Sequence, residues 1–215
     1  MNLPTGPAAS SWPAKLTEGP VTLRPIRQTD RRAWHELRDA NREWLAPWDA
    51  TTPAGVLGDS PGSFFEYVQQ LSRQARRGQT WPWVVLYQGR LVGQLTVAGI
   101  SRAAVLSANI GYWVSRDVAG RGIAPTAVAL AFDHATGPGG LHRLEVAIRP
   151  ENERSLRVVA KLGFRDEGLR QRFLHVAGAW RDHRVFALTR EEVPDGLLER
   201  WRAVSGHQID PHRPL

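Results

Sequence analysis

The spacing of apolar positions divides residues 21–188 into segments of two kinds. Alternating apolar and polar residues predict strands, whereas apolar residues three and four positions apart predict amphipathic helices. Strands are expected at residues 21–26, on both sides of Gln88-Gly89, at 107–115, at 141–150, and near 169–176 and 183–188. Helices are expected between Thr29 and Pro47, between Ser63 and Gly78, after the glycines at 120 and 122, and over 152–162. The resulting order, βααβββαβαββ, predicts one α/β domain with a mixed sheet.

Local signals mark several ends of these elements. Ser63 is a typical helix N-cap, and Gly163 stands where a C-cap is expected. Gln88-Gly89 between two apolar runs predicts a tight hairpin. Residues 1–19 lack periodicity and are expected to be a flexible arm, with the domain at 20–190. Residues 191–215 are expected to be a tail with one short helix.

The composition narrows the class of protein. The chain has 215 residues, of which 42% are hydrophobic and 23% charged, and these values are typical of a globular domain. It contains no cysteine, which excludes disulfides, thiolate metal sites and a cysteine nucleophile. No apolar run approaches the roughly 18 residues of a membrane-spanning helix. The first residues lack the layout of a secretory signal, so we expect a cytoplasmic protein with no membrane partner.

The charge is strongly basic, with a formal net charge of +7. Such a charge favours a nucleic-acid partner or an acidic ligand. Nearly all the basic residues are arginines, however, a skew that the codons of a GC-rich genome would produce equally well. Residues 142–190 hold ten arginines and one lysine against six acidic residues. The charge is therefore compatible with direct nucleic-acid binding but does not require it.

The turn that follows the strand IGYWV has the clearest chemical meaning. Gly120 and Gly122 precede a helix, and a glycine-rich turn at a helix N-terminus presents unpaired N–H groups to an anion such as phosphate. Arg121 adds positive charge. The spacing is neither the dinucleotide fingerprint, because residue 125 is proline, nor a P-loop. Alone, the turn predicts a phosphate site no more strongly than a purely structural role.

About thirty residues later come the strand LEVAIRP, Asn152-x-x-Ser155 and the helix end KLGF. With these features the sequence resembles the GCN5-related N-acetyltransferases (GNAT), and among them the ribosomal-protein-alanine N-acetyltransferases of the RimJ/RimL type. The motifs that carry the resemblance are IGYWV, VAGRGIA, RPENERS and KLGF, and it extends over nearly all of residues 20–190. It implies a three-layer α-β-α GNAT fold. The central mixed, mostly antiparallel sheet would splay between its fourth and fifth strands.

The resemblance implies that acetyl-CoA is the acetyl donor and that no metal takes part. The pantetheine arm would enter between the strands at 109–114 and 144–148. The residues implied to bind it or the pyrophosphate are Trp113, Val114, Ala119, Gly120, Arg121, Gly122, Ile123, Ala124, Asn152 and Ser155. Ala119 departs from the arginine or glutamine usual in the family. Because backbone amides form the phosphate cradle, we expect cofactor binding to survive this change.

The catalytic groups are less well marked. Many family members place a tyrosine seven residues after the asparagine, as an acid for the leaving thiolate, but here that position is Val159. Ser155 is the first alternative, although it is equally well explained as a residue of the first helical turn. Glu145 is the candidate general base, acting through a water, and is equally well explained by pairing with Arg143 or Arg149. An α-amino group, with a pKa near 8, demands little from a base.

The C-terminal arm is expected to border the acceptor groove. Glu167, His175 and His183 on this arm are weaker candidates for the base. Of the nine tryptophans, Trp34, Trp44 and Trp83 fit core positions, whereas Trp48, Trp81 and Trp180 stand by loops where the groove is expected, although core packing would explain any single one of them better.

The expected reaction is direct attack of an amine on the thioester in a ternary complex, because the chain offers no obvious covalent nucleophile. The expected acceptor is the N-terminal alanine or serine of a ribosomal protein. A closed pocket lined by acidic residues would instead favour a small amine such as an aminoglycoside, a polyamine or an amino acid. A third hypothesis is a non-catalytic, basic module that binds RNA or the ribosome. A homodimer is compatible with the sequence.

Overall fold

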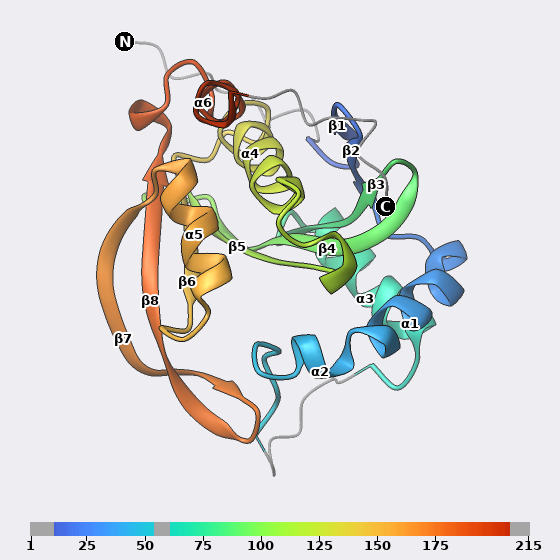
Figure 1. Cartoon of the computed structure of the whole chain (residues 1–215). Coiled ribbons are helices and arrows are strands. Elements are labelled where there is room, and N and C mark those ends of the chain that lie inside the picture. Colours follow the sequence, from blue (N-terminus) through green and yellow to red (C-terminus); the bar gives the residue numbers. More distant parts are fainter. Residues whose placement is uncertain (1–10, 54–60, 207–215) are drawn as a thin grey trace.

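The computed structural model describes residues 11–53 and 61–206 (Figure 1). The strands are β1 Leu16–Glu18, β2 Val21–Pro25, β3 Thr80–Tyr87, β4 Arg90–Ser101, β5 Ser107–Val114, β6 Arg143–Ile148, β7 Arg165–Val176 and β8 Ala179–Thr189. The α-helices are α1 Arg31–Ala40, α2 Arg42–Leu45, α3 Phe64–Arg76, α4 Ile123–Thr136, α5 Glu153–Leu162 and α6 Leu197–Ser205. In these residues the strands form one eight-stranded sheet of order β1-β2-β3-β4-β5-β6-β8-β7.

The sheet opens between β5 and β6, its one parallel pair among the described strands. The two strands pair only over Ser107–Asn109 and Arg143–Glu145. Beyond this point β5 stays with β4 up to Val114, while β6 stays with β8 up to Ile148. The central sheet therefore splays into a wedge, and this confirms the GNAT fold expected from the sequence.

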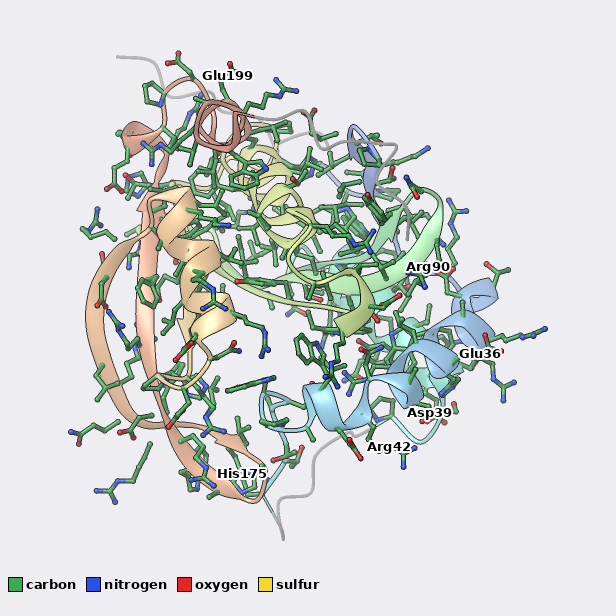
Figure 2. All side chains as sticks on the ribbon, in the orientation of Figure 1. Glu36, Asp39, Arg42, Arg90, His175 and Glu199 are labelled. Atoms are coloured by element: carbon green, nitrogen blue, oxygen red, sulfur yellow. The ribbon has the colours of Figure 1, made fainter. Side chains whose placement is uncertain are left out.

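Helices cover both faces of the sheet. α4, α5 and α6 lie on one face, and α1, α2 and α3 lie on the other (Figure 1). α4 is buried on nearly all sides, because it packs against the sheet, α5 and α6. A large core surrounds α4, and a smaller cluster that includes Phe64 and Val68 lies under α3. Charged side chains of α1 and α2, such as Asp39 and Arg42, point outward (Figure 2).

Most predicted elements are present, with several differences. Ser63 caps α3 by accepting a hydrogen bond from the Glu66 N–H, as predicted. The predicted first helix is broken at Asn41 into α1 and α2. Residues 16–18, expected within a flexible arm, form β1 instead, and β1 pairs with β2 along its whole length. Trp12 also packs edge-on against Trp83, with ring centroids 5.0 Å apart. Residues 1–10 of that arm lie outside the described residues.

The C-terminal helix braces the start of α4. The Asp133 carboxylate of α4 accepts hydrogen bonds from the Leu197 and Leu198 N–H groups, at 2.6 and 3.0 Å, and so holds the first turn of α6. Trp201 of α6 donates from Nε1 to the Thr126 hydroxyl at 2.9 Å, and this hydroxyl donates to the Gly122 carbonyl at 2.9 Å. The one short helix expected in the tail is therefore present, and it is joined to the turn that precedes α4.

Gly93 allows β4 to approach the end of β5. A Cβ at this position would lie 2.2 Å from the Trp113 carbonyl oxygen. We expect Gly93→Ala to lower the free energy of unfolding by about 1–3 kcal/mol, because two backbones would have to move apart. Urea unfolding measures this change. Gly111→Ala is the matched control, since its Cβ would meet no atom within 4 Å. Equal stability of the two variants would contradict the steric argument.

Candidate active site

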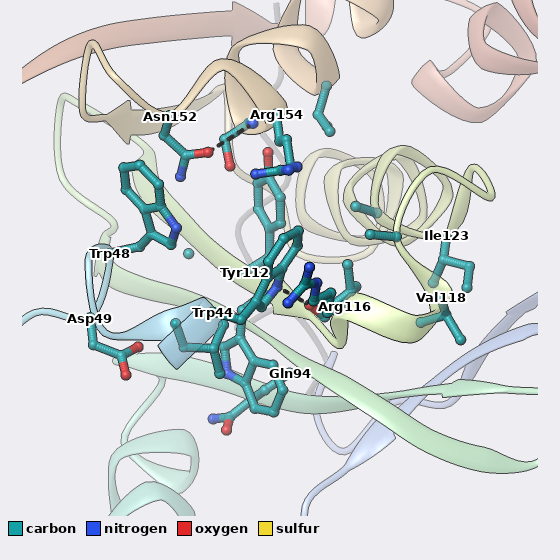
Figure 3. Close-up of a pocket in the computed structure, with 18 of the residues that line it drawn as sticks. Trp44, Trp48, Asp49, Gln94, Tyr112, Arg116, Val118, Ile123, Asn152 and Arg154 are labelled. Atoms are coloured by element: carbon teal, nitrogen blue, oxygen red, sulfur yellow. Dashed lines mark hydrogen bonds between the residues drawn. The ribbon is translucent and has the colours of Figure 1, made fainter. Parts of the chain in front are cut away.

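A cavity of about 1060 Å³ occupies the wedge between β5 and the N-terminus of α5 (Figure 3). One part, which we call the α4–α5 half, is lined by the turn before α4 and by α5. The other part, the α1–α2 half, is lined by residues of α1, α2 and the segment after α2. Residues 111–114 of β5 line the boundary between them. The cavity therefore joins two separate surfaces at the point where the sheet splays.

The turn before α4 has the conformation that an amide cradle needs. Gly120 and Gly122 have φ values of +84° and +78°, which side-chain-bearing residues rarely adopt. Gly122 is the N-cap of α4, and the Thr126 N–H makes the first intrahelical bond to its carbonyl at 3.1 Å. The N–H groups before Thr126 have no carbonyl one turn earlier to receive them. Together with the helix dipole, they suit a phosphate group.

The N-terminus of α5 brings Asn152 and Ser155 to the cavity. Asn152 is the N-cap, and its Oδ1 accepts a hydrogen bond from the Ser155 N–H at 3.2 Å. This leaves the Asn152 amide nitrogen to donate to a ligand carbonyl. The Ser155 side chain lines the cavity and is not the group that caps the helix. The geometry is compatible with the roles predicted for both residues.

A basic stripe borders the α4–α5 half. Arg154, Arg157 and Lys161 follow one another at helical spacing along α5, and all three line the cavity. Arg154 lies over the Trp44 ring, 4.4 Å from its centroid, and Arg116 approaches the same ring at 5.9 Å. These cations line the same cavity as the turn before α4, an arrangement that suits a ligand with several phosphates.

Tyr112 of β5 places an unpaired hydroxyl group in the cavity. Its oxygen is buried and has no hydrogen-bond partner among the described residues. Burial raises the pKa of Tyr112 and outweighs the opposite effect of the Ser155 hydroxyl beside it. A buried donor without a partner costs about 1–3 kcal/mol. The cost is removed if a ligand brings an acceptor to this point, so the cavity fits a polar ligand beside Tyr112.

The end of β5 is held by side chains from the other face of the sheet. Trp44 donates from Nε1 to the Val114 carbonyl at 3.1 Å. Asn41 donates to the Ser115 hydroxyl and accepts from the Arg116 N–H, both at 2.8 Å. These bonds explain why the predicted first helix breaks at Asn41. They also keep the strand end in place where β6 no longer supports it.

The α1–α2 half contains one carboxylate among the described residues, Asp49. Arg38 makes a bidentate contact with it, with distances of 2.5 and 3.3 Å. The Arg38 guanidinium itself lies near the rings of Trp34 and Trp113, 5.8 and 5.3 Å from their centroids. The Asp49 side chain retains 35% of its exposure. It therefore remains open to a cationic group.

The tip of the β7–β8 hairpin fixes the segment that carries Asp49. The Thr51 N–H donates to the His175 carbonyl at 2.8 Å, and the Thr51 hydroxyl contacts His175 Nδ1 at 2.8 Å. Figure 2 shows His175 at this end of the hairpin. The predicted border between the C-terminal arm and the groove is therefore present, although His175 itself does not line the cavity.

Glu145 does not line the cavity. Its carboxylate binds Arg143 at 3.0 Å and Arg170 at 3.2 Å, so the pairing with Arg143 considered in the sequence analysis is present. The neighbouring Glu167 contacts Arg143 and Arg165, whose hydrogen bonds lower the pKa of Glu167 to about 2. A carboxylate with this pKa is a very weak base at neutral pH. Much of the excess of arginine in residues 142–190 thus belongs to an ion-pair network on the sheet.

Most of the remaining predicted site residues line the cavity, and a few do not. The cavity is lined by Trp113, Val114, Ala119, Gly120, Gly122, Ile123, Ala124, Asn152 and Ser155, but not by Arg121. Trp34 and Trp44, expected in the core, line the cavity, as does Trp48. Trp81, considered for the groove, is buried in the core, whereas Trp180 is exposed. The sequence analysis did not select Arg38, Asp49, Tyr112 or the basic stripe. Only the stripe carries a readable signal, its helical spacing.

Known proteins share this arrangement. The GNAT acetyltransferase domain family matches residues 21–165. The chain belongs to the GNAT acetyltransferase family. The structure of Mycobacterium smegmatis RimJ in complex with CoA-disulfide is similar, with a TM-score of 0.82 and 38% identity over 91% of this chain and 96% of that one.

Two curated relatives differ in the acceptors that they are named for. The ribosomal protein uS5-alanine N-acetyltransferase of Escherichia coli is 24% identical over 85% of this GNAT protein and 94% of its own length. The spermidine N(1)-acetyltransferase of Escherichia coli is 27% identical over 75% of this chain and 82% of its own length. Family membership thus establishes that the protein is an N-acetyltransferase. It does not identify the acceptor, which has to be inferred from the residues that line the cavity.

Two further features of the described residues bear on this GNAT site. No group of three histidine, aspartate or glutamate residues in them is arranged to hold a metal ion. None of their helices has both the length and the apolar character needed to span a bilayer.

The ion pairs of Glu167 predict a dependence of stability on acidity. Because its folded pKa is lowered, its contribution is complete above the unfolded pKa near 4.5 and is lost as pH falls towards 2. Glu167→Gln should therefore be less stable than the wild type at pH 6, and the difference should shrink towards pH 2. Urea unfolding at several pH values measures it. Glu43→Gln, which alters a carboxylate of α2 without an ion pair in the described structure, is the control.

Proposed function

We propose that the protein transfers the acetyl group of acetyl-CoA to the N-terminal α-amino group of a protein, an alanine or serine of a ribosomal protein. The observation that carries this proposal is the single cavity in which a phosphate-binding turn and an aromatic surface with one carboxylate meet at the splayed strands. The name of the related uS5-alanine N-acetyltransferase supports the same acceptor class.

The α4–α5 half fits acetyl-CoA. The amide cradle at Gly120–Ala124 suits the pyrophosphate, and the amide nitrogen of Asn152 can donate to a carbonyl of the pantetheine arm. The cationic side chains that border this half complement the negative charge of the phosphates. The related RimJ structure is itself in complex with CoA-disulfide, which supports the same ligand for this cavity.

The charges of the cavity favour an acceptor with one amino group. The described lining residues include five cations and a single carboxylate, and the cations are Arg38, Arg116, Arg154, Arg157 and Lys161. A polyamine or an aminoglycoside carries several positive charges, but the α1–α2 half offers it a single carboxylate, Asp49, beside Arg38. A protein N-terminus carries one ammonium group, which Asp49 can bind. This distinguishes the proposed acceptor from the spermidine of the related enzyme.

The reaction needs little from the protein beyond positioning. A fraction of an α-amino group is neutral at neutral pH, so it can attack the thioester carbonyl once both are held together. Trp113 and Val114, at the free end of β5, line the cavity, and a strand N–H of this segment is the proposed donor that polarises this carbonyl. Glu145 acting through a water remains the predicted base, and Ser155 remains a predicted partner of the leaving group.

The acceptor is tested with labelled acetyl-CoA. Peptides that begin with alanine or serine, taken from ribosomal protein N-termini, should be acetylated, whereas the same peptides with a blocked N-terminus should not. We expect kcat/KM for spermidine and for an aminoglycoside to be at least about 100-fold lower, because the α1–α2 half offers only one carboxylate to their several positive charges. Mass spectrometry locates the acetyl group. Transfer to spermidine alone would contradict the proposal, and a failure to bind acetyl-CoA would favour the non-catalytic, RNA-binding alternative.

Asp49 should determine the affinity for the acceptor. Asp49→Asn should raise the peptide KM by about 10-fold, because a charge-assisted hydrogen bond to the ammonium is lost, while kcat changes much less. Steady-state kinetics at saturating acetyl-CoA measure both values. Asp39→Asn is the control, because Asp39 pairs with Arg42 on the exposed side of α1. An unchanged KM in Asp49→Asn would show that another group receives the amine.

A further inference from the structure

The Tyr112 hydroxyl is the one buried side-chain polar atom without a partner in the described part of the chain. Other polar side chains around the cavity are satisfied. For example, Trp34 donates to the Gln94 carbonyl oxygen at 3.2 Å, and Gln94 donates to the Tyr67 hydroxyl at 2.7 Å. An isolated orphan in an otherwise satisfied interior calls for an explanation, and a catalytic role or a partner that arrives with a ligand is one.

The position of this hydroxyl group narrows the choice of ligand atom. Tyr112 points from β5 towards the first turn of α5, between Trp44 and the Asn152–Arg154 segment (Figure 3). It is therefore on the boundary between the half that fits acetyl-CoA and the half that holds Asp49. In the proposed function, the thioester must lie at this boundary, because the acetyl group passes from one half to the other.

We propose that Tyr112 donates a hydrogen bond from its hydroxyl group to the sulfur of the CoA leaving group, with Ser155 beside it. The inference rests on the proposed function. When the amine nitrogen bonds to the acetyl carbon, the C–S bond breaks and its electron pair goes to sulfur. The proton lost by the amine leaves to water, and the thiolate is later protonated from water. Tyr112 stabilises the developing negative charge and keeps its own proton throughout.

This role differs from that of a general acid. Burial raises the pKa of Tyr112, whereas a thiol has a pKa of about 8.5. Full proton transfer from Tyr112 to the thiolate is therefore uphill, but a hydrogen bond to the thiolate is favourable. The helix position at which many family members place a tyrosine is Val159, which is buried in the core. The strand thus supplies the hydroxyl group that the helix lacks.

The test uses Tyr112→Phe, which removes one oxygen atom. The first readout is the pKa of the CoA thiol in the complex, followed through the ultraviolet absorbance of the thiolate as pH is raised. The charged groups that line the cavity are Arg38, Arg116, Arg154, Arg157, Lys161 and Asp49, and all remain in the variant. We expect the pKa of the bound thiol to be higher in Tyr112→Phe than in the wild type.

Two further readouts separate this role from a structural one. The kcat for acetyl transfer should fall by about 10- to 100-fold, without the loss of any pKa from the pH profile. The melting temperature of the ligand-free variant should be unchanged or higher, because an unsatisfied buried hydroxyl group is removed. Tyr87→Phe is the control: Tyr87 is buried in β3 outside the cavity, and its variant should keep the wild-type thiol pKa and kcat.

The outcomes distinguish the two proposals. If acetyl-CoA does not bind to the wild-type protein, the proposed function fails. If the wild type acetylates peptides but Tyr112→Phe keeps its thiol pKa and kcat, only the role of Tyr112 is overturned. Weaker CoA binding with an unchanged thiol pKa would place the hydroxyl group on a carbonyl of the pantetheine arm, which also overturns it. Loss of a basic limb from the kcat profile would indicate a general acid instead.

Discussion

The separation of β5 from β6 after three paired residues is the constraint on which the rest of the structure depends. A strand that loses its neighbour exposes backbone groups that must find other partners. Here the Trp44 indole donates to the Val114 carbonyl, while Asn41 donates to the Ser115 hydroxyl and accepts from the Arg116 N–H. The helices on the opposite face thus carry the bonds that a continuous sheet would have made. The gap stays open without leaving the strand end unsupported.

The charged residues form two groups, one paired on the outer strands and one around the cavity. On the outer strands, arginines and carboxylates alternate across β6, β7 and β8 and largely neutralise each other. Around the cavity the cations outnumber the acids, and Arg116 and Arg154 lie over the Trp44 ring without a carboxylate partner in the described residues. These two arginines keep their full charge for a ligand, because no counter-ion among the described residues offsets it. The net charge of +7 alone would not have separated these two populations.

Features encoded within a few residues were predictable. The tight turn predicted at Gln88-Gly89 is present, and both residues have positive φ values. Ser63 caps the N-terminus of α3, and Gly163, with a left-handed backbone, ends α5. The break at Asn41 was not predictable, because its cause is a contact with residues 74 positions later. Periodicity likewise indicated that Trp44 faces inward but not what covers it, and the structure places it at the cavity. Trp81 takes the core position that was the alternative to a place near the groove. Asp49 has no local signal at all.

The attachment of α6 to the turn before α4 has a consequence for recognition of the donor. A flexible glycine turn would have to be ordered each time a ligand bound, and this ordering would weaken the affinity. Here the indole of Trp201 holds Thr126, and Thr126 holds the Gly122 carbonyl. The entropy of ordering is therefore lost during folding and not during each catalytic cycle. Helix α6, remote in sequence and outside the cavity, thus keeps the turn before α4 in one conformation for the ligand.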